Sequence, residues 1–140
     1  MPTPFILLID GDPKSLKLME VGLRRDDYDV ASLTDAAAAR AWSASHPPDL
    51  IVSDVDLPGG GFDLLGDLRA REGWGNVPVV ALTSNRSAEV VQRGMTVGAE
   101  EFLTRPVFVR ELLARVRMVL ERRAHAPDGP ETGASGALDE

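Results

Sequence analysis

Residues 6–13 read ILLIDGDP, an apolar run that stops at two aspartates with a glycine between them. A continuous apolar run of this kind is typical of a strand that is covered on both faces. Pro13 suits the first position of a helix, and Asp12 suits the capping position before it. The stretch therefore predicts a buried strand that passes almost at once into a helix, with Asp10 at the junction.

The same succession of apolar strand and helix repeats along the chain. Predicted strands cover residues 5–10, 28–33, 49–54, 77–83 and 100–104. Predicted helices cover residues 13–25, 35–46, 62–72, 87–99 and 109–123. Apolar strands that alternate with helices form parallel units joined by right-handed crossovers. The pattern predicts an α/β fold with an open, doubly wound sheet of five parallel strands.

Composition excludes several classes of protein. Of the 140 residues, 44% are hydrophobic and 26% are charged, which are ordinary values for a globular domain. The absence of cysteine excludes disulfides and thiolate metal sites, and a cytoplasmic location is expected. The first residues lack the basic region of a signal peptide and the long apolar run of a membrane span. A net charge of −7 argues against direct contact with nucleic acid by this domain.

Residue usage divides the chain into a domain at residues 4–124 and a tail at residues 125–140. The last fifteen residues, APDGPETGASGALDE, contain four acidic residues, no basic residue and almost no large side chain. A segment of this composition cannot bury enough apolar surface to offset the entropy of folding. We expect the tail to be a linker or a disordered end.

Polar side chains follow four of the predicted strands. In doubly wound sheets the functional crevice lies at the carboxyl ends of the strands. Carboxylates crowded there repel one another unless a cation lies among them, and oxygen ligands of this kind suit Mg²⁺. Helix capping is the alternative role for Asp12, and starting a turn is the alternative for Asp56. The residues expected together at this edge are Asp10, Asp12, Asp54, Asp56, Thr83 and Arg105.

Four motifs occur in an order that resembles the receiver domain of two-component response regulators: ILLIDGDP, DLIVSDVDLPGG, VPVVALTS and EEFLTRP. The resemblance covers residues 5–123, nearly the whole chain apart from the tail. It implies a flavodoxin-like sheet with strand order 2-1-3-4-5. It also implies that one aspartate accepts a phosphoryl group from a histidine kinase or phosphotransfer protein, with Mg²⁺ as cofactor. Such a domain is not an enzyme that turns over a separate substrate.

The resemblance assigns a role to individual residues. Asp54 corresponds to the phosphoacceptor, and the carboxylates of Asp10 and Asp54 correspond to metal ligands. Asp56 corresponds to the residue that offers its backbone carbonyl to the metal. Thr83 matches the hydroxyl residue that follows the phosphoryl group, and Phe102 matches the aromatic switch residue.

Three features depart from the family pattern. Gly11 stands where the family has a second acidic metal ligand, so Mg²⁺ binding is expected to be weak, although Asp12 is a candidate substitute. Arg105 stands at the family's lysine position, where it keeps the positive charge but presents a larger planar fork. The loop after Asp54 is one residue short. Because phosphoryl transfer depends on positioning and on charge neutralisation, the first two changes lower its expected rate.

Signalling is expected to involve the face formed by residues 87–99, 100–104 and 109–123, through contact with a downstream protein or effector domain. If Thr83 moves toward a phosphoryl group, it vacates space for an aromatic ring at position 102. Phe102 has no hydroxyl to keep in water, so an exposed ring costs roughly 1.5–3 kcal/mol. We therefore expect Phe102 to lie inward without phosphate and partner binding to depend only weakly on Asp54.

Three interpretations of function remain open from the residues. The chain is a phosphoacceptor receiver, or a pseudo-receiver that serves as a protein-interaction module without phosphorylation. The third is a phosphatase of the haloacid-dehalogenase type, because Asp54 and Asp56 also match its Asp-x-Asp motif. That family expects a threonine where Pro58 stands, and the chain has no room for a cap domain, so the third interpretation is disfavoured.

Overall fold

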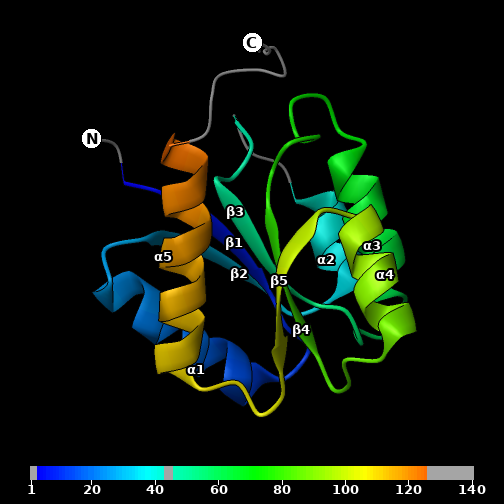
Figure 1. Ribbon diagram of the computed structural model, residues 1–140, viewed down its shortest axis with the longest axis horizontal. Helices are drawn as coiled ribbons and strands as arrows, with labels where there is room; N and C mark the ends of the chain where they lie inside the picture. Colours follow the sequence, from blue (N-terminus) through cyan, green and yellow to red (C-terminus); the bar gives the residue numbers. More distant parts are fainter. Residues whose placement is uncertain (1–2, 43–45, 126–140) are drawn as a thin grey trace, which may run out of the picture.

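The computed structural model of the chain describes residues 3–42 and 46–125. The segment 126–140, which we expect to be a linker or disordered, lies outside these residues. Within the described ranges, strands and helices alternate in the predicted order (Figure 1). None of the helices in this part of the chain is long and apolar enough to cross a membrane.

The sheet has the predicted architecture. Its strands are β1 (Phe5–Ile9), β2 (Asp29–Leu33), β3 (Leu50–Asp54), β4 (Val79–Thr83) and β5 (Ala99–Thr104). The helices are α1 (Pro13–Arg25), α2 (Ala36–Ala41), α3 (Gly61–Arg69), α4 (Ala88–Thr96) and α5 (Val109–His125). Neighbouring strands pair in parallel in the order β2-β1-β3-β4-β5, which confirms the doubly wound α/β fold.

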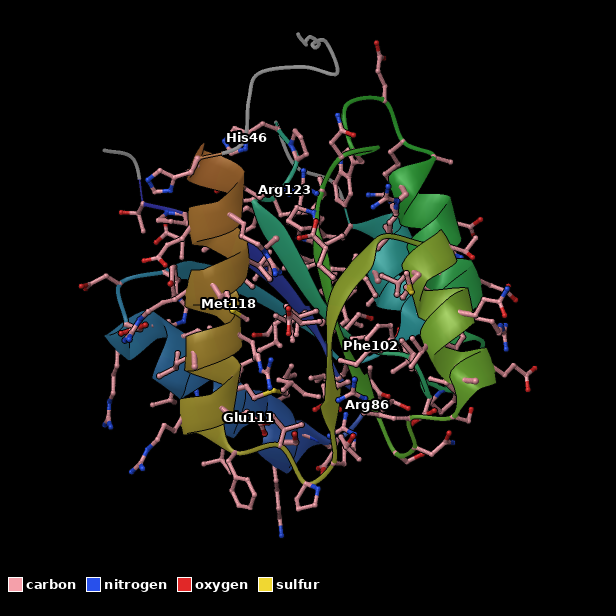
Figure 2. The ribbon with its side chains drawn as sticks, viewed as in Figure 1. His46, Arg86, Phe102, Glu111, Met118 and Arg123 are labelled. Atoms are coloured by element: carbon pink, nitrogen blue, oxygen red, sulfur yellow. The ribbon has the colours of Figure 1, made fainter. Side chains whose placement is uncertain are left out.

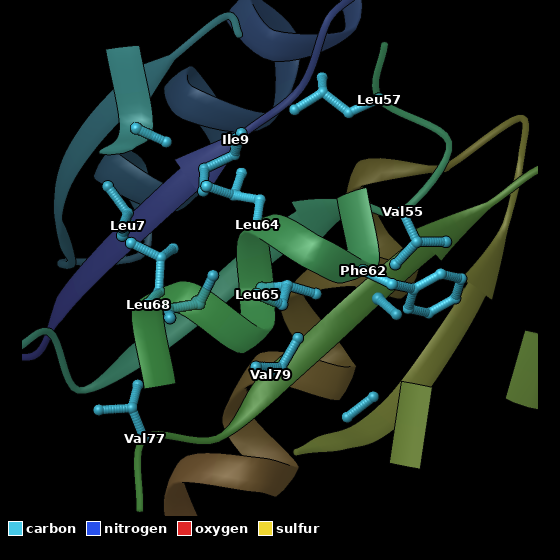
Figure 3. Packing of buried hydrophobic residues seen from close by; sticks show 14 of the residues in the cluster. Leu7, Ile9, Val55, Leu57, Phe62, Leu64, Leu65, Leu68, Val77 and Val79 are labelled. Carbon is cyan, nitrogen blue, oxygen red and sulfur yellow. The ribbon is translucent and has the colours of Figure 1, made fainter. Parts of the chain in front are cut away.

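Helices cover both faces of the sheet, with α1 and α5 on one face and α2, α3 and α4 on the other (Figure 1). Ile6 and Leu8 of β1 belong to the core cluster under α1 and α5, whereas Leu7 and Ile9 belong to the cluster under the other helices. Figure 3 shows this second cluster, to which α3 contributes Leu64, Leu65 and Leu68. Since successive strand residues point to opposite faces, both sets must be apolar, which explains the unbroken run in β1.

The predicted helix at residues 35–46 is wrong in its length. Asp35 caps it by accepting a hydrogen bond from the Ala38 N–H at 2.7 Å. The helix α2 nevertheless ends at Ala41, and Trp42 is already in an extended conformation. The alanine-rich stretch therefore forms a shorter helix than its propensity indicates.

Tertiary contacts explain the early end of α2. The ring of Trp42 lies 5.9 Å from the ring of Phe5 and 6.1 Å from that of Trp74, centroid to centroid. The guanidinium of Arg71 donates hydrogen bonds to the carbonyl oxygens of Arg40 and Trp42, at 2.7 and 2.9 Å. These contacts satisfy the last helical carbonyls and hold Trp42 against its aromatic neighbours, so the helix need not continue.

At the other end of the domain, α5 extends through His125, one residue into the segment expected to be a tail. Arg24 and Arg25 in the last turn of α1, and Arg122, Arg123 and His125 in the last turn of α5, place basic side chains at the negative ends of the helix dipoles. The described fold therefore covers the whole of the expected domain at residues 4–124 apart from residues 43–45.

Candidate functional site

The site begins with two buried aspartates at the ends of adjacent strands. Residues Ile9 and Ser53 are paired across β1 and β3, so Asp10 and Asp54, each one residue further on, lie side by side at the carboxyl edge of the sheet. Asp10 is fully buried and Asp54 is 7% exposed. Two carboxylates are costly in such a place unless hydrogen bonds or a cation compensate their charge.

Arg105 supplies a cation to both carboxylates. Its Nη2 atom lies 2.8 Å from Oδ1 of Asp10 and 3.3 Å from Oδ2 of Asp54. Its Nη1 atom lies 3.3 Å from the hydroxyl oxygen of Ser15, in the first turn of α1. The backbone N–H of Arg105 donates to the carbonyl of Thr83 at 2.9 Å, which holds the arginine beside the end of β4. One side chain thus connects α1 with the residue that follows β1 and with the last residue of β3.

Backbone N–H groups provide the remaining contacts of the two aspartates. Asp56 N–H donates to Oδ1 of Asp54 at 2.8 Å, and Asp12 N–H donates to Oδ1 of Asp10 at 3.0 Å. Burial raises the pKa of Asp54, and the negative charges of Asp10 and Asp56 add to this, while the Asp56 N–H and Arg105 oppose it. Oδ2 of Asp10 is buried and has no hydrogen-bond partner among the described residues.

The other two aspartates of the expected cluster direct their carboxylates elsewhere. Asp12 caps α1, with Oδ1 accepting from the Lys14 N–H at 3.1 Å, so the capping alternative is the one observed. Oδ2 of Asp56 accepts from the Ser84 N–H at 2.7 Å, which ties the loop after β3 to the loop after β4. Among the described residues, no three acidic or histidine side chains are grouped so that they could hold a metal ion.

Thr83 and Phe102, the two residues expected to take part in switching, are both buried. Thr83 ends β4 and is fully buried. Its hydroxyl donates to the Asn85 carbonyl at 2.6 Å and accepts from the Asn85 N–H at 3.1 Å, so it is engaged within its own loop. Phe102 of β5 is buried in the core cluster, which confirms the expectation that its ring lies inward.

The ring of Phe102 has Gly94 and Arg86 as neighbours from other parts of the chain. A side chain at Gly94 of α4 would meet it, since an added Cβ would lie 2.5 Å from Cε2 and 2.7 Å from Cζ of Phe102. The guanidinium of Arg86 lies 6.0 Å from the ring centroid, at the outer limit of a cation–π contact (Figure 2). The inward position of the ring therefore depends on the missing side chain of Gly94.

Sequence comparison identifies the family to which the chain belongs. Residues 6–117 match the family described as the response regulator receiver domain. The chain belongs to this family. It is a receiver domain of a two-component response regulator, and the resemblance carried by its four motifs is confirmed.

This receiver domain is similar to the amino-acid sequences of several bacterial regulators. It is 34% identical over 139 residues to the transcriptional regulatory protein PrrA of Mycobacterium tuberculosis, covering 98% of this chain and 59% of PrrA. It is 37% identical over 125 residues to the DNA-binding dual master transcriptional regulator RpaA of Synechocystis, covering 89% of this chain and 52% of RpaA. The chain thus spans about half the length of the curated relatives it matches.

Solved structures show the same receiver fold. The chemotaxis response regulator CheY4 of Vibrio cholerae matches with a TM-score of 0.75 and 27% identity, covering 84% of this chain and 99% of CheY4. The receiver domain of the sensor histidine kinase PA1611 of Pseudomonas aeruginosa matches with a TM-score of 0.74 and 26% identity, covering 86% of this chain and 99% of that domain. The PA1611 structure has a magnesium ion coordinated in its active site cleft.

The structure brings together only some of the residues predicted to form the site of this receiver domain. The structure brings Asp10, Asp54 and Arg105 into direct contact, with Thr83 adjacent, and sends the carboxylates of Asp12 and Asp56 to backbone N–H groups. Sequence reasoning missed Ser15 and Ser84. Ser15 had one weak signal, because the first turn of α1 starts at the same sheet edge as Asp10. Ser84 acts through its backbone, which no side-chain pattern can indicate.

Proposed function

We propose that Asp54 accepts a phosphoryl group from the phosphohistidine of a histidine kinase or phosphotransfer protein. The observation that carries the proposal is the carboxylate of Asp54 at the sheet edge, 3.3 Å from the guanidinium of Arg105. A cation at this point offsets the charge that a phosphoryl group brings. An oxygen of Asp54 forms the bond to phosphorus as the phosphorus–nitrogen bond breaks, and the released imidazole nitrogen takes up a proton.

The residues around Asp54 have distinct parts in this proposal. Arg105 neutralises the acidic edge before transfer and donates to the phosphoryl oxygens afterwards. The hydroxyl of Thr83 becomes a second donor when it exchanges its bond to Asn85 for one to the phosphoryl group. The N–H of Asp56 holds Oδ1 of Asp54, so that Oδ2, the oxygen nearer Arg105, is the one oriented for bond formation.

Mg²⁺ fits this arrangement poorly, and we expect it to bind weakly. Gly11 has no ligand to offer, and the carboxylates of Asp12 and Asp56 are engaged by backbone N–H groups. The guanidinium of Arg105 already lies against the two remaining carboxylates, those of Asp10 and Asp54. Asp10, Asp54 and the carbonyl of Asp56 are the ligands that remain for an ion. When bound, Mg²⁺ would supply further positive charge at the phosphoryl group.

Gly11→Asp is expected to tighten Mg²⁺ binding by about tenfold, some 1.4 kcal/mol. The added carboxylate restores an oxygen ligand, and in metal-free protein it increases repulsion with Asp10 and so lowers stability. A Cβ at position 11 would lie 3.3 Å from Cδ1 of Leu57, a side chain that needs to shift only slightly. Calorimetric titration of Mg²⁺ into both proteins measures the change. Equal affinities would contradict the role assigned to position 11.

Phosphorylation itself is tested with a small phosphodonor such as acetyl phosphate in the presence of Mg²⁺. The wild-type protein should gain the mass of one phosphoryl group, located on Asp54 by peptide mapping, and Asp54→Asn should gain none. Asp12→Asn is the matched control, because Asp12 caps α1 and should leave the mass gain intact. A wild-type protein without mass gain, against a typical receiver that is labelled in parallel, would contradict the proposal.

The second candidate function is a pseudo-receiver that binds partners without phosphorylation. It is favoured by one observation, the engagement of Asp12, Asp56 and Arg105 in contacts internal to the metal-free site. The absence of phosphoryl gain in the experiment above would select it. Neither candidate turns over a separate substrate, and both are proposed to act in the cytoplasm.

We further propose that the domain contacts a downstream protein or effector domain through α4, β5 and α5. Glu100 and Glu101 of β5 form ion pairs with Arg115, Arg122 and Arg123 of α5. Met95 of α4 and Met118 of α5 are both exposed, and Figure 2 shows Met118 and Arg123 on α5. Charged pairs and exposed methionines on the same three elements suit a protein surface that binds other proteins. The proposal includes no contact of this face with nucleic acid.

A further inference from the structure

The guanidinium of Arg105 is in contact with both buried carboxylates of the site, the position expected of a divalent cation. We infer that Arg105 is the resident cation of this site and that a divalent cation binds tightly only when the guanidinium leaves Asp10 and Asp54. The inference rests on the proposed function in one respect, that Asp54 is the acceptor whose environment is being neutralised. The protein's own guanidinium thus takes the place that a dissolved divalent cation would otherwise occupy.

The charges of the site support this assignment. Asp10 is fully buried and Asp54 nearly so, and a single nitrogen of Arg105 lies within 3.3 Å of an oxygen of each. The usual sources of further negative charge are missing, because Gly11 has no side chain and Asp12 is exposed at the start of α1. With one acid fewer than the family pattern, the site needs less positive charge, and the guanidinium offsets one of the two negative charges that Asp10 and Asp54 carry.

The shape of the arginine side chain is suited to this role. A guanidinium carries several N–H donors in a fixed plane, whereas a lysine ammonium is a single point of charge. Here Nη2 faces the two carboxylates while Nη1 reaches the Ser15 hydroxyl at 3.3 Å. The Arg105 side chain is only 25% exposed. Ser15 therefore acts as a positioning residue that holds the guanidinium over the acids.

One acceptor of the site is left over. Oδ2 of Asp10 is buried and has no hydrogen-bond partner among the described residues, although Oδ1 of the same carboxylate has two. Buried polar atoms are nearly always satisfied, so this oxygen is an acceptor that a ligand can use. Mg²⁺ needs only one or two carboxylates when waters complete its shell. Removing the guanidinium should therefore uncover a metal site rather than destroy one.

Arg105→Met tests the inference, since methionine keeps apolar volume and removes the charge. In protein stripped with EDTA, the variant should unfold at a lower temperature, because Asp10 and Asp54 lose their cation. Mg²⁺ at millimolar concentration should restore most of that loss, and calorimetry should show binding at least about tenfold tighter than to wild type. Arg40→Met, which breaks the exposed ion pair between α2 and Asp67 of α3, is the matched control and should show neither effect.

Ser15→Ala keeps the test decisive if Arg105→Met does not fold. Loss of the hydroxyl frees the guanidinium, and Mg²⁺ binding should tighten by a few-fold with little loss of stability. The inference is overturned if neither variant binds Mg²⁺ more tightly than wild type. These measurements need no phosphodonor, so their outcome is independent of the test of the proposed function. Tighter Mg²⁺ binding by the variants without labelling of Asp54 would refute the phosphorylation of Asp54 and leave the inference about Arg105 standing.

Discussion

Replacing Gly61 by alanine should destabilise the domain by about 2–3 kcal/mol, the cost of overpacking a rigid contact. Gly61 is the first residue of α3 and is buried. An added Cβ would lie 2.6 Å from the carbonyl carbon, the Cα and the oxygen of Val55. These are backbone atoms, which cannot move aside as the end of a side chain can. Because Val55 follows Asp54 directly, the displacement should also disturb the acceptor.

Gly66→Ala is the matched control for this prediction. Gly66 lies in the middle of the same helix and is exposed, and an added Cβ would meet nothing within 4 Å. Alanine is the better helix former there, so the variant should gain up to about 1 kcal/mol. Urea unfolding of both variants measures the difference. Equal changes in stability for the two variants would contradict the claim that the close contact with Val55 requires glycine at position 61.

Gly94→Ala should expel the ring of Phe102 from its buried position, at a cost of about 1–3 kcal/mol. The added Cβ would lie 2.5 Å from Cε2 and 2.7 Å from Cζ of the ring. A movement of the ring within its own plane would therefore not relieve both contacts. The ring must therefore rotate toward solvent or α4 must separate from β5. Either change alters the α4–β5–α5 face that we propose for partner binding.

A double-mutant cycle separates this clash from an ordinary loss of helix stability. In a Phe102→Ala background, Gly94→Ala should cost much less than in wild type, because the ring that it displaces is already gone. Gln92→Ala, at an exposed position of the same helix, should stay within about 0.5 kcal/mol of wild type in both backgrounds. Additive effects of the two substitutions at positions 94 and 102, measured by urea unfolding, would contradict the proposed contact.

Much of the fold follows from local patterns in the sequence. The apolar runs at β1, β3 and β4 predict strands covered on both faces, and helices of clear periodicity alternate with them. Asp12 before Pro13 predicts where α1 begins, because capping depends on residues that are adjacent in the chain. Period and chain order suffice for these conclusions, and they place the carboxylates at one edge of the sheet.

The end of α2 shows where such patterns stop being sufficient. Alanine-rich sequence favours helix as far as the two prolines at residues 47 and 48, yet α2 ends at Ala41. Trp42 leaves the helix for contacts with Phe5 and Trp74, and Arg71 satisfies the open carbonyls. Each of these partners is distant in sequence. Propensity is a weak preference that tertiary contacts of this size override.

The same distinction between local patterns and tertiary contacts applies to the functional site. The sequence by itself determined which carboxylates reach the sheet edge. It also showed that Gly11 stands where the family pattern has a further acid, and that position 105 is an arginine. Only the tertiary structure decided that the Arg105 guanidinium contacts both Asp10 and Asp54, that Ser15 holds it, and that the carboxylates of Asp12 and Asp56 face backbone N–H groups. The physical reason is that strand ends are set by local patterns, whereas the direction of a charged side chain is set by the competition among all the partners that folding brings within reach.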